Sequence, residues 1–161
     1  MQPTNREIQH HFLEAMAQGY VLDNVPKSTI RELPESKVIP YELGDFKVLD
    51  CYYTATDSNK STGQTIMWFR DKPVWIMCYG GEYADIAIPF LKQCLHRAYV
   101  QERRFYGGRG PHFVRGDRFT YTNDIRQEFI DGFEGEERIF DLSEQPLGYH
   151  WYRGMSLLQQ D

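Results

Sequence analysis

One β-hairpin constrains the fold of this chain more than any other feature. Two runs rich in aromatic and branched residues, Thr65–Arg70 and Pro73–Tyr79, are joined at Asp71 and Lys72. Two such runs around a short polar link predict paired strands. Pro73 has no N–H to donate to a strand ladder, so we expect it at the start of its strand or on a sheet edge.

Further strands are predicted on both sides of this hairpin. Phe46–Ala55, rich in Val, Tyr and Phe, predicts a strand before it, and the connector of residues 20–44 has room for one short turn or strand near Lys37–Tyr41. Gly132 and Gly135 predict a bulge or a sharp bend within one of the later strands. Three extended segments are expected there: Asp117–Ile125, Phe129–Leu142 and Leu147–Leu158.

The N-terminus predicts an amphipathic helix. Thr4 and Glu7 fit a capping box, in which each side chain satisfies a terminal backbone N–H of the other. The helix is expected to run to Gln18, and Gly19 is placed to end it.

A second helix is predicted over Ala84–Val100, after Gly80 and Gly81 break the preceding strand. Its apolar residues recur at helical spacing, so we expect it to pack on the sheet and to supply much of the core. Strands that follow one another on short turns favour antiparallel pairing with the helices on one side. The sequence therefore predicts an α+β fold, with an antiparallel sheet of five to six strands, one main helix packed on one face and a peripheral N-terminal helix.

The length and composition narrow the class of protein. At 161 residues we expect a single domain, in which residues 1–44 form the N-terminal helix and a wrapping connector and residues 45–158 form the core. The net charge of -5 argues against charge-driven binding of nucleic acid. Three cysteines without a CxxC pair, and the lack of a signal peptide or an apolar span, favour a cytoplasmic protein that does not enter a membrane.

A basic, glycine-rich segment, Arg103–Arg118, is the strongest pointer to function. Its sequence, RRFYGGRGPHFVRGDR, has five arginines, four glycines and a single acid. Arg109 and Arg115 flank a Gly-Pro-His segment, and arginine forks pair with phosphate or carboxylate while glycines let backbone N–H groups approach an anion. This segment therefore predicts binding of a small anion. The alternative is that its arginines bridge to the acids of residues 124–137 across the sheet.

Aromatic side chains supply a second candidate for a binding site. Aromatic residues make up 15% of the chain, and such rings line many ligand pockets. A packed sheet core is the commoner reason for a high content of aromatic residues. The candidates for a pocket lined by aromatic rings and arginine are Trp68, Trp75, Tyr79, Arg109, His112, Arg115, Tyr121 and Trp151.

Two histidines are the candidates for catalysis. His112 lies in the basic segment and His150 on the last predicted strand, and either could form an acid–base pair with Glu134 or Glu136. The alternative is that both histidines are structural hydrogen bonders. No metal-ligand spacing such as H-x-x-x-H or C-x-x-C occurs, so we expect neither a metal nor a cofactor.

Several aromatic–glycine motifs occur in a characteristic order: WFRDKPVWIMCYGG, YGGRGP, GDRFTYTND, GFEGEERI and YHWYRG. In this the chain resembles an uncharacterised bacterial domain family, over roughly residues 45–155, that is found alone or behind a helix-turn-helix of the XRE type. The resemblance implies a sensor or accessory domain of regulatory proteins and assigns no catalytic residue. The N-terminal segment predicts one helix, too few for a helix-turn-helix reader, so we do not expect direct binding of nucleic acid.

Three functions remain open from the sequence. The first is a module that binds a small anionic ligand or a protein partner through the open sheet face and the basic segment. The second is a small hydrolase or transferase that uses His112 or His150 with a nearby glutamate. The third is a homodimer formed through the sheet edges or the first helix.

Overall fold

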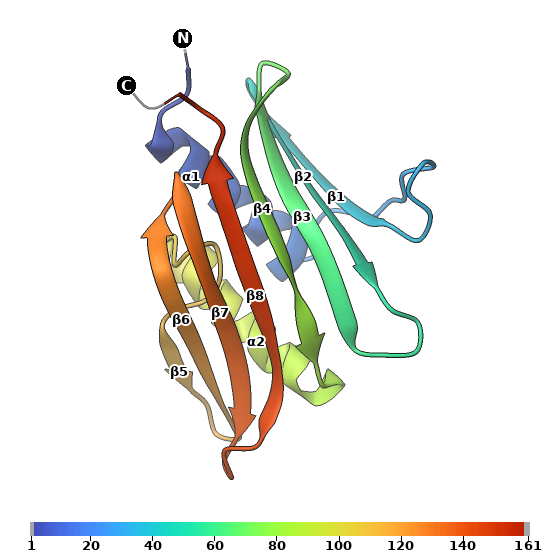
Figure 1. Ribbon diagram of the computed structural model, residues 1–161, viewed down its shortest axis with the longest axis vertical. Helices are drawn as coiled ribbons and strands as arrows, with labels where there is room; N and C mark the ends of the chain where they lie inside the picture. Colours follow the sequence, from blue (N-terminus) through green and yellow to red (C-terminus); the bar gives the residue numbers. More distant parts are fainter. Residues whose placement is uncertain (1, 160–161) are drawn as a thin grey trace.

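The structure, a computed structural model, describes residues 2–159. One antiparallel sheet has the strand order β1-β2-β3-β4-β8-β7-β6-β5, and both helices lie on the same side of it (Figure 1). The strands are β1 (Lys37–Leu43), β2 (Phe46–Thr54), β3 (Lys60–Phe69), β4 (Lys72–Tyr83), β5 (Phe113–Arg115), β6 (Phe119–Phe129), β7 (Gly132–Asp141) and β8 (Pro146–Ser156).

The predicted α+β fold is wrong in its proportions. Residues 2–159 are mostly sheet, with eight strands instead of five to six and two short helices instead of one main helix. The two additional strands, β1 and β5, form the two edges of the sheet. Pro40 lies within β1 and β5 has three residues, and edge strands tolerate both features because one side needs no ladder partner. The sequences of β1 and β5 therefore lack a strong strand pattern, and this is why the predicted number of strands was too low.

The N-terminal helix α1 (Asn5–Met16) is part of the core, so its predicted peripheral position is wrong as well. The capping box of Thr4 and Glu7 is present, but the helix continues beyond Met16 as a π-helical turn over Ala17–Val21. Gly19 does not end it. A Cβ at Gly19 would lie 2.3 Å from Cγ2 of Ile39, so glycine is needed there for close approach of the helix to β1.

The second helical segment spans a 3₁₀ turn at Asp85–Ala87, α2 (Ile88–His96) and a π-helical turn at Arg97–Glu102. It ends at Arg103, which has a left-handed φ of 49°. The prediction that Gly80 and Gly81 end the preceding strand is wrong, because β4 runs through both to Tyr83.

The central hairpin is confirmed as β3 and β4. Its two turn residues are Arg70 and Asp71, both with positive φ, one position before the predicted link. The expected irregularity is not at Gly132 or Gly135 themselves: β6 shifts register between Ile125 and Gln127, opposite Gly135 and Glu134. A second register shift, in the pairing of β7 with β8, lies between Ile139 and Phe140.

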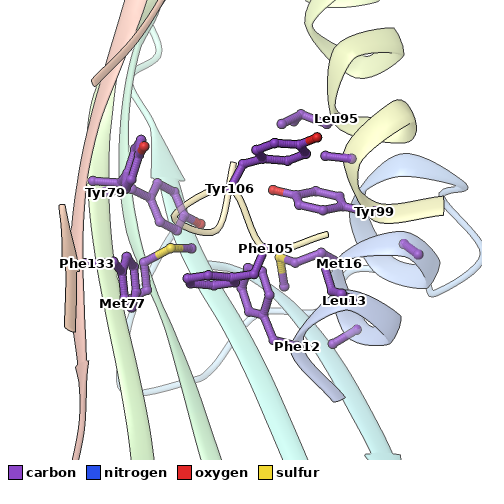
Figure 2. Packing of buried hydrophobic residues seen from close by; sticks show 14 of the residues in the cluster. Phe12, Leu13, Met16, Met77, Tyr79, Leu95, Tyr99, Phe105, Tyr106 and Phe133 are labelled. Atoms are coloured by element: carbon purple, nitrogen blue, oxygen red, sulfur yellow. The ribbon is translucent and has the colours of Figure 1, made fainter. Parts of the chain in front are cut away.

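The core lies between the sheet and the two helices (Figure 2). Trp75 on β4 is fully buried, stacks on Phe133 at 5.3 Å between ring centroids and contacts Phe12 of α1 at 5.1 Å. Figure 2 shows Phe105 and Tyr106 inserted between the sheet residues and the helix residues. The basic segment thus enters the core.

Candidate functional site

The central part of the basic segment is buried. All seven residues from Phe105 to Pro111 are shielded from solvent. Phe105 and Tyr106 among them lie between the sheet and the helices (Figure 2). Gly107 and Gly108 adopt φ values of +61° and +86°, which other residues rarely accept. The two glycines therefore turn the chain inward and do not cradle an anion at the surface.

Arg109 forms a buried ion pair with Glu137. Its Nε donates to Oε1 at 3.0 Å and its Nη2 donates to the same oxygen, while the Tyr121 hydroxyl donates to Oε2 at 2.6 Å. Burial opposes ionisation of this carboxyl, but the guanidinium and these hydrogen bonds hold the pKa of Glu137 below its usual value. Arg109 thus bridges to an acid across the sheet, as the structural interpretation expected.

A cavity of about 370 Å³ opens beside this ion pair, between the core face of the sheet and the helical segments. Residues from α1, β2, β3, β4, α2 and β8 contribute to its walls. Arg109, Asp50, Tyr79, Tyr83 and His150 form its buried side. Its volume lies near the lower end of the roughly 300–1,000 Å³ typical of small-molecule sites.

Gly81 in β4 shapes the inner wall of this cavity. Ser61, Gly81, His150 and Glu137 lie directly opposite one another on β3, β4, β8 and β7. Because Gly81 has no side chain, Ser61 Oγ and His150 Nε2 meet across it at 3.1 Å. A Cβ on Gly81 would lie 2.0 Å from the Tyr149 carbonyl oxygen.

His150 is held neutral in this wall. It is 7% exposed, and burial, together with the charge of Arg109, lowers its pKa to about 4 against an opposing effect of Glu137. Its Nδ1 is buried and has no hydrogen-bond partner among residues 2–159. An unsatisfied buried polar atom of this kind calls for a specific explanation.

Tyr83 presents a second unsatisfied group. Its ring lies 5.1 Å from that of His150, and its hydroxyl makes no hydrogen bond of normal geometry within the described chain. Burial, and then the nearby Glu137 carboxylate, raise the pKa of Tyr83 well above its usual value, so the hydroxyl keeps its proton. The inner wall thus contains one hydroxyl and one imidazole nitrogen that are buried and lack a normal hydrogen bond.

Asp50 is a buried carboxyl without an ion pair in the described part of the chain. It is 4% exposed, and Thr65 and Tyr79 donate hydroxyl hydrogen bonds of 2.8 and 2.7 Å to its Oδ1. Burial raises its pKa, and these two hydrogen bonds oppose the rise. Glu137 and Asp50 therefore differ: the first is neutralised by an arginine and the second is not.

Lysines surround the opening of the cavity. Four of them line it, whereas the acids that line it are Asp50 and Asp85. Aromatic rings support the lysine side chains: Tyr52 lies under two of them, with centroid distances of 5.9 and 5.8 Å, and Tyr20 under a third at 5.5 Å. These lysines are Lys27, Lys37, Lys60 and Lys92. In a chain of net charge -5, this concentration of positive charge favours anions locally.

The structure brings only part of the predicted site together. Tyr79, Arg109 and His150 line the cavity, whereas Trp75 and Tyr121 are fully buried and do not. The central part of the basic segment lies in the core, and the open sheet face lies on the other side, so these two surfaces form no common site.

The other candidates lie away from the cavity. His112 and Arg115 are exposed, and Glu134 pairs with Arg126 at 3.5 Å outside the cavity. Trp151 is 44% exposed and lies on the face of β8 opposite His150. It borders a separate groove of about 520 Å³, and Trp68 lines neither space.

Sequence reasoning missed Asp50, Tyr83, Ser61 and the four lysines. One signal could have found Asp50: it alternates with Val48 on β2, so an acid occupies the phase of the strand that faces the core. The lysines carry no such signal, because they come from separate elements and meet only in the folded chain.

The fold and the cavity define a class: a curved antiparallel sheet with helices on one face and an internal space between the two layers. The chain belongs to a family described as a domain of unknown function, DUF5680, whose model matches residues 50–155. This range contains Asp50, Arg109, Glu137 and His150 and excludes α1. Comparisons with curated proteins and with solved structures gave no significant match. None of the helices within residues 2–159 has the length and apolar character needed to cross a membrane.

Proposed function

We propose that the protein is a ligand-binding domain that holds a small organic anion in the cavity between its sheet and its helices. One observation carries the proposal: a space of about 370 Å³ has two buried polar groups without partners on its inner wall and lysines at its opening. A packed core has neither the space nor the unsatisfied groups.

The unsatisfied groups favour binding because a ligand would satisfy them. A buried donor or acceptor without a partner costs about 1–3 kcal/mol. Tyr83 and His150 both carry such a group on the same wall, so a ligand that hydrogen-bonds to them relieves that cost. The groove beside Trp151 is less well suited, since none of the unsatisfied buried side-chain atoms of the described chain lies in it.

The geometry favours binding over catalysis. His150 faces the cavity, but Glu137 opposite it is held by Arg109 and Tyr121, and no carboxylate hydrogen-bonds to the imidazole in the described chain. His112 lies 3.7 Å from Glu128, but it is exposed and lines neither the cavity nor the groove beside Trp151. Neither histidine therefore forms a shielded acid–base pair.

Thermal unfolding and calorimetric titration with a panel of small carboxylates and phosphates test the proposal. Members that fit should raise the melting temperature, and their affinity should fall as salt is added. Lys60→Glu should weaken binding about 3- to 10-fold, since it reverses one charge at a partly exposed opening. Lys72→Glu is the matched control, because Lys72 is exposed on the hairpin and lines neither of these spaces. Absence of binding across the panel, or equal effects of both variants, contradicts the proposal.

In the cell, such a domain would report the level of its ligand. The resemblance to domains associated with XRE-type regulators supports a role as a cytoplasmic sensor in bacteria. A pull-down of helix-turn-helix regulators with and without saturating anion tests this role. If no partner depends on the anion, the sensor role fails and ligand binding stands.

A homodimer through the sheet edges is a second proposal about partners. The apolar face of α1 packs against the sheet of its own chain, so it is not free to form a dimer contact. A homodimer formed through the first helix is therefore not proposed. The edge strands β1 and β5 supply the alternative. A monomeric mass in solution, measured over a range of protein concentrations, contradicts it.

A further inference from the structure

Asp50 points to the class of ligand. The two buried carboxyls near the cavity have different partners: Glu137 has the guanidinium of Arg109, whereas Asp50 has only two hydroxyl groups. Both hydroxyls donate to Oδ1, so neither of these bonds reaches Oδ2. A buried carboxylate normally needs a cation or several strong donors.

The walls around Asp50 restrict what can satisfy it. Of the four lysines that line the cavity, three lie against tyrosine rings at its opening, and none comes within 4.0 Å of the Asp50 carboxyl. Tyr79, which donates to Asp50, is itself 8% exposed and belongs to the inner wall. A ligand that reaches the inner wall can therefore supply the positive charge that pairs with Asp50.

We propose that the ligand is amphoteric: an organic anion whose anionic group is held by the lysines and whose opposite end carries an amine or another N–H donor for Asp50. This inference rests on the proposed function and adds the chemistry of the buried end. The tyrosine rings that line the cavity suit an apolar or aromatic body.

The test uses three matched pairs of anions that differ only in the amine. They are 4-(aminomethyl)benzoate with 4-methylbenzoate, 6-aminohexanoate with hexanoate, and phosphoethanolamine with ethyl phosphate. Calorimetric titration of the full chain should show at least one pair in which the amine strengthens binding about 10-fold or more, as expected for a charge-assisted hydrogen bond. This comparison needs no variant and so does not depend on one that folds.

Two variants then assign the preference to one residue. Asp50→Asn keeps the size and the acceptor for Thr65 and Tyr79 but removes the charge, and it should abolish the amine preference while anions without an amine still bind. Tyr79→Phe removes one donor and keeps the carboxyl, so the preference should persist. If Asp50→Asn keeps the preference, Asp50 is not the acceptor and the inference fails.

The outcomes separate this inference from the proposed function. If anions bind with and without an amine alike, and Lys60→Glu weakens both, the amphoteric class is refuted and anion binding stands. If no member of any pair binds, the amphoteric class is refuted, and the wider panel of carboxylates and phosphates decides the proposed function.

Discussion

Replacing Arg109 by methionine tests how the buried ion pair stabilises the fold. Arg109→Met removes the guanidinium and leaves the Glu137 carboxylate, which is fully buried and still accepts a hydrogen bond from the Tyr121 hydroxyl. Breaking a buried pair in this way typically costs about 3–5 kcal/mol, since a charge stays behind without its partner. That is a large part of the 5–15 kcal/mol expected for a whole protein.

Urea unfolding followed by far-UV circular dichroism measures this loss. With a slope of about 1–3 kcal/mol per molar urea, the midpoint should fall by roughly 1–5 M. The double variant Arg109→Met/Glu137→Gln should recover at least half of the lost stability, because the amide is neutral and can still accept from Tyr121. Arg115→Met is the control and should change stability by less than about 0.5 kcal/mol, because Arg115 is exposed and makes no ion pair within residues 2–159. A single variant that loses less than about 1 kcal/mol, or a double variant no more stable than the single one, refutes the reasoning.

Three further predictions follow from the same geometry. His150 has its pKa lowered to about 4 from an ordinary 6.5, so the stability that its neutral ring contributes is complete above 6.5 and is lost progressively as the pH falls from 6.5 to about 4. This loss should reach about 3 kcal/mol in the free energy of unfolding, measured with urea at about pH 7 and about pH 4.5. His150→Asn should abolish this pH-dependent loss, and an unchanged pH dependence in the variant contradicts the prediction. Gly81→Ala places a Cβ 2.0 Å from the Tyr149 carbonyl oxygen and should destabilise the protein by at least about 2 kcal/mol in the same assay. An unchanged stability would contradict this, because it would show that β4 and β8 move apart at no cost. Phe12→Ala should cost about 3–5 kcal/mol, because the ring is fully buried under the sheet, whereas a loss below about 1 kcal/mol would restore a peripheral N-terminal helix.

The sequence predicted the central strands because their patterns are local. The alternation around Trp75 and the polar link after Arg70 depend on neighbours in the chain, and the resulting hairpin is present. The capping box of Thr4 and Glu7 is local in the same sense and is confirmed. Helix lengths and the edge strands were harder, because π-helical turns and edge pairing depend on what the rest of the fold offers.

The glycines were harder to interpret, because their roles are tertiary. Gly19 occurs where a C-cap is expected, but it is there for Ile39 on β1. Gly81 occurs where a strand break is expected, but it gives Ser61 and His150 room to meet. A sequence does not show which distant side chain needs the space that a glycine leaves.

The candidate site was predicted in its chemistry more than in its residues. The basic segment pointed to an anion, and its Arg109 does line the cavity, but as one half of an ion pair. Asp50 and Tyr83 lie 33 positions apart in the chain and meet only because β2 and β4 flank β3. Periodicity shows that such residues face inward and does not show that they line a space.

The measurement that tests the central claim most directly is methyl NMR of protein labelled at its methionines. Met16 and Met77 line the cavity, Met67 is fully buried away from it, and Met155 is 53% exposed on the other side of β8 from His150. Titration with the tightest-binding anion of the panel should shift the methyl signals of Met16 and Met77 and leave that of Met155 in place. A shift of Met155 without the other two, or no shift at saturation, would contradict binding in the cavity.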